Sequence, residues 1–387
     1  MSKKIFVDGL GLVDGHFSGV GQYILGILRG IDEVLETKKT ACEQVPEIYV
    51  IVPRDEVKKF KKFGFKHIGY RSFPLPFRYM SALWHRRWLP PMDLIYGRGV
   101  YLFPRFVNMP LAFSKSVLVI FDLSYELHRQ FSDEGNALFL SKQVKASLKK
   151  TKKVITISKN AKREIIEFYG LPAENVKVAT PAADQRELYR RSDKEIQKVK
   201  EKYGISGNYI LALSNLEPRK NLDTLVEVYC RLPKELRKNT PLLLVGVTGW
   251  KTDELFMKII DKVNQGYDII RPSAYVKDKD KPAIISGAKL LVYPSHYEGF
   301  GMPPLEALAC GVPVITANNS SLPEVVGEAA AMVPSQDSNQ LLIRLTEYLQ
   351  IIDKKSEQTI TEGPARARQF SWVKSAEIFL DALEELA

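Results

Sequence analysis

The stretch HYEGFGMPPLEALACGVPVI, residues 296–315, combines a glycine turn, two adjacent prolines and two glutamates. The apolar run before it predicts a strand that ends near Ser295, and the leucine- and alanine-rich run after the turn predicts a short helix stopped by Gly311. Pro303 and Pro304 fall at the start of that helix, where a missing N–H costs little. The turn therefore presents backbone donors and the positive end of a helix dipole, which together favour an anion.

Two carboxylates flank this turn. Glu306 lies just inside the predicted helix, where it could accept hydrogen bonds from a vicinal diol such as a ribose. Glu298 precedes the turn, on the side that a second part of the same ligand would occupy. The alternative interpretation is two solvated charges beside a proline-initiated helix. The backbone amides that we expect to be free for an anion are those of Phe300, Gly301, Met302 and Leu305.

A second anion signal lies upstream, in LALSNLEPRKNLDTL, which follows a predicted strand from Tyr209 to Ser214. Arg219 and Lys220 fall at the strand-to-helix turn, where two adjacent cations can neutralise a diphosphate and assist its departure. Ser214 and Asn215 end the same strand and are further candidates for ligand contact. Ordinary surface charge is the alternative for the two cations.

Strand-length apolar runs alternate with amphipathic stretches along the whole chain. The runs lack polar alternation, as expected for strands that are buried on both faces of a parallel sheet. The rhythm occurs twice, which predicts an α/β protein with two doubly wound, Rossmann-like domains. The predicted strands are 4–8, 48–53, 117–122, 154–158 and 176–180 in the first half, and 209–214, 242–247, 289–294 and 314–317 in the second.

Length and charge agree with two domains and indicate an anionic partner. The 387 residues fit two or three domains at about 150 residues each. Residues 1–187 hold 30 Lys and Arg against 19 Asp and Glu, whereas the remainder holds 26 of each. The polar segment 181–207 connects the halves. No apolar run approaches the roughly 20 residues of a membrane span, and the N-terminus has no signal-peptide pattern, so we expect a cytoplasmic protein.

These motifs together resemble glycosyltransferase family 4. The resemblance rests on Glu298 and Glu306 within EGFGMPPLEALACGVPVI, on LEPRKNL upstream, and on SGVGQY at residues 18–23. It covers nearly the whole chain and is similar to bacterial mannosyl- and rhamnosyltransferases of surface-polysaccharide assembly. It implies retaining enzymes of the GT-B fold, in which two Rossmann-like domains face each other across a cleft. The expected domains are residues 1–187 for the acceptor, 188–366 for the nucleotide sugar, and a C-terminal helix, 367–387, that crosses back.

The resemblance also implies roles for single residues. Glu306 would bind the donor ribose, Arg219 and Lys220 the diphosphate, and Glu298 the sugar near its reacting carbon. The amides of Phe300–Met302 would hold sugar hydroxyls. From the other domain, Gly19, Val20 and Gly21 would approach the phosphate, and the base would lie near Tyr275 and Val276. No metal or other cofactor is expected.

One position departs from the family pattern. The family usually has a histidine facing the donor sugar in an HDL segment, and this chain has Phe121 there, in VIFDL. Phenylalanine can neither hydrogen-bond a hydroxyl nor donate a proton. Either Asp122 or another residue replaces the histidine, or the donor is a 6-deoxy sugar that fits an apolar wall.

Other motifs favour local structure. DGLGLVDG, residues 8–15, has the wrong glycine spacing for a dinucleotide fingerprint. Asp278 and Asp280 form a DxD, but Lys281 and Pro282 follow, so a charged turn that starts a helix is preferred over a metal site. The histidines show no metal-ligand spacing, and local packing is preferred for His296.

Residues 57–92 contain nine Lys and Arg, no Asp or Glu, and nine aromatic residues. Such a mixture suits the headgroup layer of an anionic membrane. Two alternatives are a core helix and strand with solvated lysines, or single-stranded nucleic acid, which this pattern also fits. We prefer the membrane.

The sequence thus predicts a cytoplasmic glycosyltransferase on the inner face of the plasma membrane. It would move mannose from GDP-mannose, or a 6-deoxy sugar such as rhamnose, to a hydroxyl of a lipid-linked saccharide. Two other classes stay open: a GT-B hydrolase or phosphorylase, and a non-catalytic basic protein that binds membrane or nucleic acid.

Overall fold

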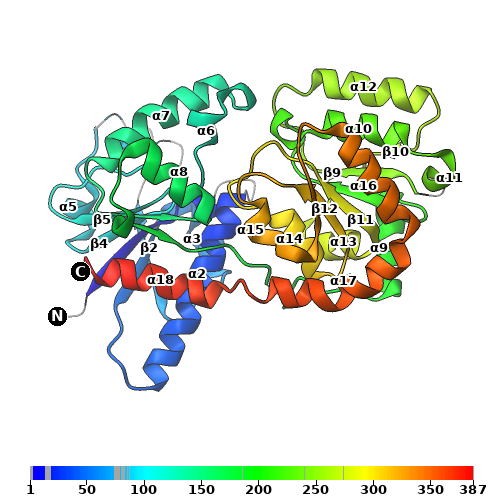
Figure 1. The fold of residues 1–387 in the computed structure, drawn as a ribbon. Coiled ribbons are helices and arrows are strands. Elements are labelled where there is room, and N and C mark those ends of the chain that lie inside the picture. Colours follow the sequence, from blue (N-terminus) through cyan, green and yellow to red (C-terminus); the bar gives the residue numbers. More distant parts are fainter. Residues whose placement is uncertain are drawn as a thin grey trace. The chain divides into compact units, whose positions relative to one another are not determined.

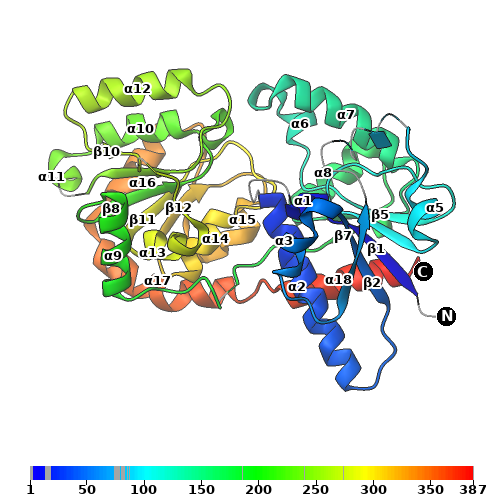
Figure 2. The same ribbon diagram turned by 180° about the vertical axis from the view of Figure 1, so that it is seen from behind.

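The computed structural model describes residues 3–13, 19–73, 79, 83–84, 86, 88–184, 186–238, 240–272 and 274–386. The chain divides into two compact units (Figures 1 and 2). The N-terminal unit comprises Met1–Leu127, Glu134–Pro181 and Ser371–Ala387, and the C-terminal unit comprises His128–Asp133 and Ala182–Phe370. The boundaries predicted after residues 187 and 366 fall instead after Pro181 and Phe370, and the short segment His128–Asp133 of the C-terminal unit was not predicted.

The N-terminal unit is built on a seven-stranded parallel sheet with the order β3-β2-β1-β4-β5-β6-β7. Its strands are short, apolar and buried, because helices cover both faces of the sheet. The strands are β1 (Lys4–Asp8), β2 (Glu47–Pro53), β3 (Ile68–Phe73), β4 (Val100–Phe103), β5 (Lys115–Val119), β6 (Lys153–Thr156) and β7 (Val176–Val178).

Long helices cover this sheet, and the C-terminal helix is one of them. Helix α18 packs along α2, where Gly26 and Gly30 allow the close approach: a Cβ at either position would lie 2.5 Å from an atom of Trp372. The hydroxyl of Ser375 also donates to Thr180 O at 2.7 Å. The helices of this unit are α1 (Leu10–Val13), α2 (Gly19–Thr40), α3 (Val57–Lys61), α5 (Met92–Tyr96), α6 (Ser124–Leu127), α7 (Glu134–Leu148), α8 (Lys159–Tyr169) and α18 (Trp372–Glu384).

The C-terminal unit has a six-stranded parallel sheet with the order β10-β9-β8-β11-β12-β13. β8 and β11 are neighbours at its centre, so the loops that follow them meet at one edge, where ligands bind in such sheets. The strands are β8 (Tyr209–Leu213), β9 (Leu242–Val245), β10 (Ile269–Ile270), β11 (Ala288–Tyr293), β12 (Val314–Ala317) and β13 (Ala331–Val333).

Two groups of helices cover the faces of this second sheet (Figure 1). α10 packs with α12 and with α16 over a core of leucine, isoleucine and valine side chains. α13 packs with α9 and α14, and α14 packs with α17. The helices are α9 (Asp193–Tyr203), α10 (Leu222–Arg231), α11 (Lys234–Arg237), α12 (Asp253–Asn264), α13 (Lys281–Ser286), α14 (Met302–Ala309), α15 (Leu322–Val326), α16 (Ser338–Gln350) and α17 (Ile352–Ala367).

The basic aromatic stretch, residues 57–92, has two kinds of aromatic side chain. Phe60, Phe73 and Trp84 are buried, and Phe73 and Trp84 belong to the apolar core of the N-terminal unit. Trp88 is 70% exposed. Phe77 lies outside the described residues. The stretch is therefore partly core and partly surface. Within the described part of the chain, no helix has the length and apolar character needed to cross a membrane.

Candidate active site

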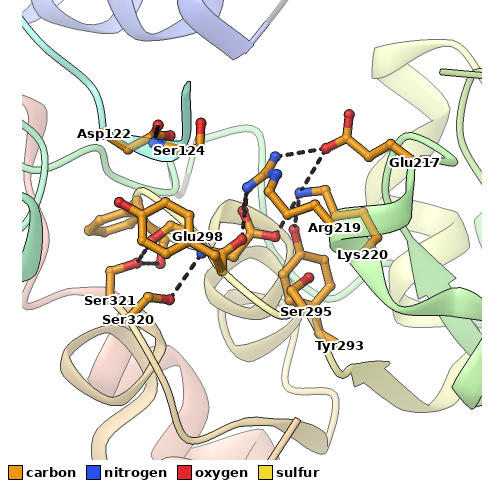
Figure 3. A network of polar contacts seen from close by, with 12 residues as sticks. Asp122, Ser124, Glu217, Arg219, Lys220, Tyr293, Ser295, Glu298, Ser320 and Ser321 are labelled. Carbon is orange, nitrogen blue, oxygen red and sulfur yellow. Dashed lines mark hydrogen bonds and ion pairs between the residues drawn. The ribbon is translucent and has the colours of Figure 1, made fainter. Parts of the chain in front are cut away.

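The candidate site is built from the two loops that follow β8 and β11 (Figure 3). After β8 the chain makes a short 3-10 turn, Pro218–Lys220, and Asn221 takes a left-handed conformation before α10. After β11 it passes through Glu298 into α14, which begins at Met302. A backbone bond from His296 N to Arg219 O, 2.9 Å long, ties the two loops together.

Glu298 is the centre of a network of charges. It is 5% exposed, and both of its carboxylate oxygens accept from cations. Lys220 Nζ donates to Oε1 at 2.7 Å, and Arg219 Nη1 donates to Oε2 at 3.0 Å. Lys220 also donates to the hydroxyl of Tyr293 at 3.0 Å, and Arg219 to Tyr297 O at 2.8 Å. The structure thus brings together the three residues that the sequence assigned to diphosphate and sugar.

A fourth charge completes the network and was missed in the sequence. Glu217 Oε1 accepts from Arg219 Nη2 at 2.8 Å and lies 4.0 Å from Lys220 Nζ. Glu217 is only 4% exposed. Its place two residues before Arg219 in LEPRKNL was the available signal, because a carboxylate so close to two adjacent cations can pair with them.

The two basic neighbours of Glu298 hold its carboxyl group in the ionised form. Burial acts to raise the pKa of Glu298, but Arg219 and Lys220 outweigh it and lower that pKa to about 2. Burial and the Arg219 charge lower the pKa of Lys220, against the opposite pull of Glu298 and Glu217. Glu298 is therefore ionised at neutral pH.

Serine side chains fix the turn that carries Glu298. Ser320 Oγ accepts from Glu298 N at 3.0 Å, and Ser321 Oγ donates to Glu298 O and Phe300 O at 2.8 and 2.7 Å. Gly301 has φ 118°, in the region that favours glycine, and a Cβ there would lie 2.7 Å from Leu322 Cδ2. Serine side chains about 20 residues later in the sequence therefore fix the conformation of this turn.

The backbone donors of this turn agree in part with the prediction. Among the described residues, the amides of Phe300, Gly301 and Met302 have no protein acceptor. Leu305 differs: its amide donates to Gly301 O at 3.4 Å, because α14 already begins at Met302. Its predicted contribution to an anion site is corrected accordingly. Pro303 lies in the first turn of α14, as expected.

Glu306 lies in α14, 3% exposed, and accepts from Lys281 Nζ at 2.9 Å. Burial lowers the pKa of Lys281, but Glu306 foremost, with Asp278 and Tyr275, raises it above its usual 10.5. Lys281 was not predicted as a site residue. Tyr275, in the expected base region Tyr275–Val276, is 64% exposed.

Asp280 and His296 pack locally, as the sequence predicted. Asp278–Asp280 is a 3-10 turn that leads into α13, and Asp280 accepts from Tyr203 OH at 2.8 Å and pairs with Lys202. His296 stacks on Phe131 at 5.1 Å.

Four other predicted site residues, Gly19, Val20, Gly21 and Asp122, belong to the N-terminal unit. Gly19–Gly21 begin α2, and Asp122 follows β5 and accepts from Ser124 N at 2.9 Å. Phe121 is 7% exposed, with Tyr23 and Phe106 each 5.3 Å from its ring. In the C-terminal unit, Ser214 N donates to Val245 O at 2.9 Å, and Asn215 is exposed.

Comparison with known proteins decides the family. Residues 193–366 match the family model described as "Glycosyl transferases group 1". The chain is 35% identical over 359 residues to the O-antigen chain mannosyltransferase B of Escherichia coli, covering 92% of this chain and 93% of that protein. The chain belongs to the glycosyl transferases of group 1.

Two further comparisons extend this result. This glycosyltransferase is 29% identical over 246 residues to the serotype-specific mannosyltransferase WbdA of Escherichia coli, a match that spans 62% of this chain and 30% of WbdA. HepE of Anabaena, solved in complex with UDP and glucose, aligns with a TM-score of 0.72 at 18% identity and covers 100% of both chains. The resemblance to glycosyltransferases and the GT-B fold are confirmed.

Proposed function

We propose that this glycosyltransferase transfers mannose from GDP-mannose, with retention of configuration, to a hydroxyl of a lipid-linked saccharide during polysaccharide assembly. The names of its relatives, an O-antigen chain mannosyltransferase and a serotype-specific mannosyltransferase, support the sugar and the pathway class. The observation that carries the proposal is the buried cluster of Arg219, Lys220 and Glu298 beside a helix start.

The donor lies along the carboxyl edge of the C-terminal sheet. Its diphosphate contacts Arg219 and Lys220 and accepts from the turn amides at Phe300–Met302. Its ribose hydroxyls donate to Glu306, and its base lies beside Tyr275–Val276. Lys281 orients the Glu306 carboxylate, since Lys281 Nζ donates to Glu306 Oε1 at 2.9 Å.

The chemical step breaks the bond between the anomeric carbon and the diphosphate oxygen. The acceptor oxygen forms the new bond on the face that the leaving group departs from, and its proton passes to the departing phosphate. Arg219 and Lys220 stabilise the charge that develops on the diphosphate. Both Glu298 oxygens bind these cations, so Glu298 positions them first and stabilises positive charge on the sugar through space. Asp122 is the candidate to replace the family histidine that faces the donor sugar, and the proposed step uses no metal.

Mannose is preferred over a 6-deoxy sugar as the transferred group. The packing of Tyr23 and Phe106 around Phe121 leaves little of that ring free to line a sugar. Rhamnose from a GDP- or dTDP-linked donor remains the second candidate for the sugar. A GT-B hydrolase or phosphorylase is the second candidate for the reaction.

The test is a donor and acceptor assay with purified protein. GDP-mannose is incubated with a lipid-linked saccharide, and the product is analysed by mass spectrometry and by NMR for its anomeric configuration. We expect one added hexose with an α linkage, as in the α-linked donor. Free mannose without transfer would indicate a hydrolase, an inverted linkage would exclude retention, and preferential use of dTDP-rhamnose would overturn the donor.

We also propose contact with an anionic membrane on the cytoplasmic side, through what we call the α5 surface: Arg86, Trp88, Leu94, Ile95, Arg98 and Phe113. Phe113 is 67% and Leu94 59% exposed, and Trp88 is also exposed. Arg98 lies 4.8 Å from the Phe113 ring centroid, and Arg86 lies 5.5 Å from that of Trp88. Aromatic side chains flanked by arginines suit the headgroup layer.

The α5 surface is rigid and basic. Asp93 is the one acidic residue among the described residues from 86 to 115, and it is buried. It accepts from the amides of Ala112, Phe113 and Ser114, each at 2.8 Å, which locks α5 onto the loop that carries Phe113. The surface lies at the amino ends of β4 and β5, so the carboxyl edge of that sheet, where Asp122 lies, stays clear of the membrane.

A further inference from the structure

Glu217 is a buried carboxylate beside the two cations that the donor needs. Its Oε1 is 2.8 Å from Arg219 Nη2 and 4.0 Å from Lys220 Nζ. Burying a carboxylate is costly, and Glu298 already pairs with both cations. Glu217 is therefore the carboxylate that brings the formal charge of this group of four side chains to zero.

The backbone around Glu217 fixes its position. Leu216 forms a bridge to Thr248, with Leu216 N donating to Val247 O at 2.9 Å and Gly249 N donating to Leu216 O at 2.8 Å. A Cβ on Gly249 would lie 2.6 Å from Leu216 O, so the two segments run in close contact. Glu217 is thus held at a fixed distance from the cations.

The charge balance indicates what Glu217 does. With Glu217 the cluster has no net charge, and without it the cluster would carry one excess positive charge. Transfer leaves a nucleoside diphosphate whose terminal phosphate has an additional ionisable oxygen, so the product is more negative than the donor. A strongly positive cluster would then hold the product more tightly than the donor and slow each turnover.

We propose that Glu217 weakens the hold of Arg219 and Lys220 on the product diphosphate and so sets the rate of product release. It is a positioning residue, since it acts through the two cations rather than on the donor. The inference rests on the proposed function, because it needs a nucleoside diphosphate at these cations.

The test compares GDP and GDP-mannose binding by titration calorimetry in the wild-type protein, Glu217→Gln, Glu217→Asp and Glu235→Gln. Glutamine keeps the size of Glu217 and removes its charge, and Glu235 is an exposed glutamate on α11. We expect Glu217→Gln to bind GDP about tenfold more tightly than the wild type does, with a smaller increase in its affinity for GDP-mannose. Its kcat at saturating donor, measured in a transfer assay, should be lower. Glu217→Asp keeps the charge but withdraws it by one methylene, so its GDP affinity should fall between those of the wild type and Glu217→Gln. Glu235→Gln should bind GDP as the wild type does.

The pH dependence gives a second readout. Tyr293, Glu298, Arg219 and Glu217 face Lys220, whose pKa is already lowered by burial and by Arg219. Removing the Glu217 charge lowers that pKa further, so the tighter GDP binding should fade as the pH rises and Lys220 loses its proton sooner than in the wild type.

Each outcome separates the two proposals. A wild-type protein that binds no nucleoside diphosphate removes the proposed function and this inference with it. A wild-type protein that binds GDP, with a Glu217→Gln variant that binds it equally or more weakly, overturns the role of Glu217 and leaves the proposed function standing. Because the affinities are measured on folded protein, a purely structural effect would appear as weaker binding.

Discussion

At the scale of single residues, the site is a set of buried charges that need one another. Glu298 binds both cations, Glu217 binds Arg219, and Glu306 binds Lys281. Removing one partner from such a pair leaves an uncompensated charge in a site with little access to water. The ion pairs around the proposed diphosphate site therefore also stabilise the C-terminal unit.

Glu298→Gln should reveal this coupling through pH. At pH 7 we expect it to lower the free energy of unfolding by about 3 kcal/mol, because Arg219 and Lys220 lose their shared carboxylate. The folded-state pKa of Glu298, about 2, lies below its usual 4.5. Its stabilisation is therefore fully present above pH 4.5 and is lost as the pH falls toward 2.

Urea unfolding at pH 7, 4.5 and 3 measures this prediction. The difference between wild type and Glu298→Gln should shrink below pH 4.5, because the unfolded wild type then takes up a proton on Glu298 that the folded protein, with a pKa of about 2, does not. A difference that stays constant over this range would mean that Glu298 is not ionised within the ion pairs.

The sequence pointed to some of these residues and not to others, for a physical reason. Arg219, Lys220, Glu298 and Glu306 stand next to turn and helix-start signals, so their loops could be placed at one sheet edge from the strand pattern. Lys281 pairs with Glu306 across 25 positions, and no local pattern reports such a pairing. Glu217 was close to the cations in sequence, but its burial arises from the contact with Thr248 and Gly249, a tertiary effect.

At the scale of elements, short apolar strands fix where the loops lie, and the turns orient the backbone N–H groups. Strands 4–8 and 314–317 were predicted with their observed bounds, because their ends coincide with a change from apolar to polar residues. β3, β4, β10 and β13 were missed: β3 lies within the basic aromatic stretch, and β10 has only two residues. Whether such short segments form strands depends on their tertiary contacts and burial, which hydrophobic periodicity does not report.

Gly301→Ala tests the turn between Glu298 and α14. The residue has φ 118°, and an added Cβ would lie 2.7 Å from Leu322 Cδ2, so we expect a loss of about 1–3 kcal/mol in stability. The turn amides would also shift, so KM for the donor should rise severalfold.

Gly266→Ala is the matched control for this turn. Gly266 also has a positive φ, 87°, but a Cβ there meets no atom within 4 Å and it lies beyond α12. It should lose some stability and keep the wild-type KM. An unchanged KM in both variants would mean that the turn amides do not contact the donor.

At the scale of the whole molecule, most of the excess positive charge belongs to the N-terminal unit, whereas exposed apolar side chains occur in both units. The basic aromatic stretch was predicted as one membrane-binding segment, but Phe60, Phe73 and Trp84 are buried. Exposure of Leu94 and Phe113 comes from the way Asp93 fixes α5 to the following loop, which no composition count reveals. The α5 surface is therefore narrower than the predicted stretch and extends beyond it.

Vesicle sedimentation tests the α5 surface. The wild type should sediment with phosphatidylglycerol vesicles and be released by high salt, and Trp88→Ser with Phe113→Ser should bind at least tenfold more weakly, at roughly 1.5–3 kcal/mol per buried aromatic side chain. Leu138→Ser with Phe139→Ser removes two exposed apolar side chains from α7 of the same unit and should bind normally.

Two outcomes would contradict this surface. The first is equal loss of vesicle binding in both double variants. The second is a wild type that ignores vesicles but self-associates through Trp88 and Phe113, which would make the surface a contact between proteins.

The most direct test of the whole account is GDP binding to a protein without the two cations of the site. Titration calorimetry would compare the wild type with Arg219→Gln, Lys220→Gln and with a control, Lys194→Gln, Lys198→Gln, which removes two exposed charges from α9. The account predicts GDP binding at least about 100-fold weaker in the first double variant and unchanged in the control. Wild-type GDP affinity in a folded Arg219→Gln, Lys220→Gln protein would contradict it.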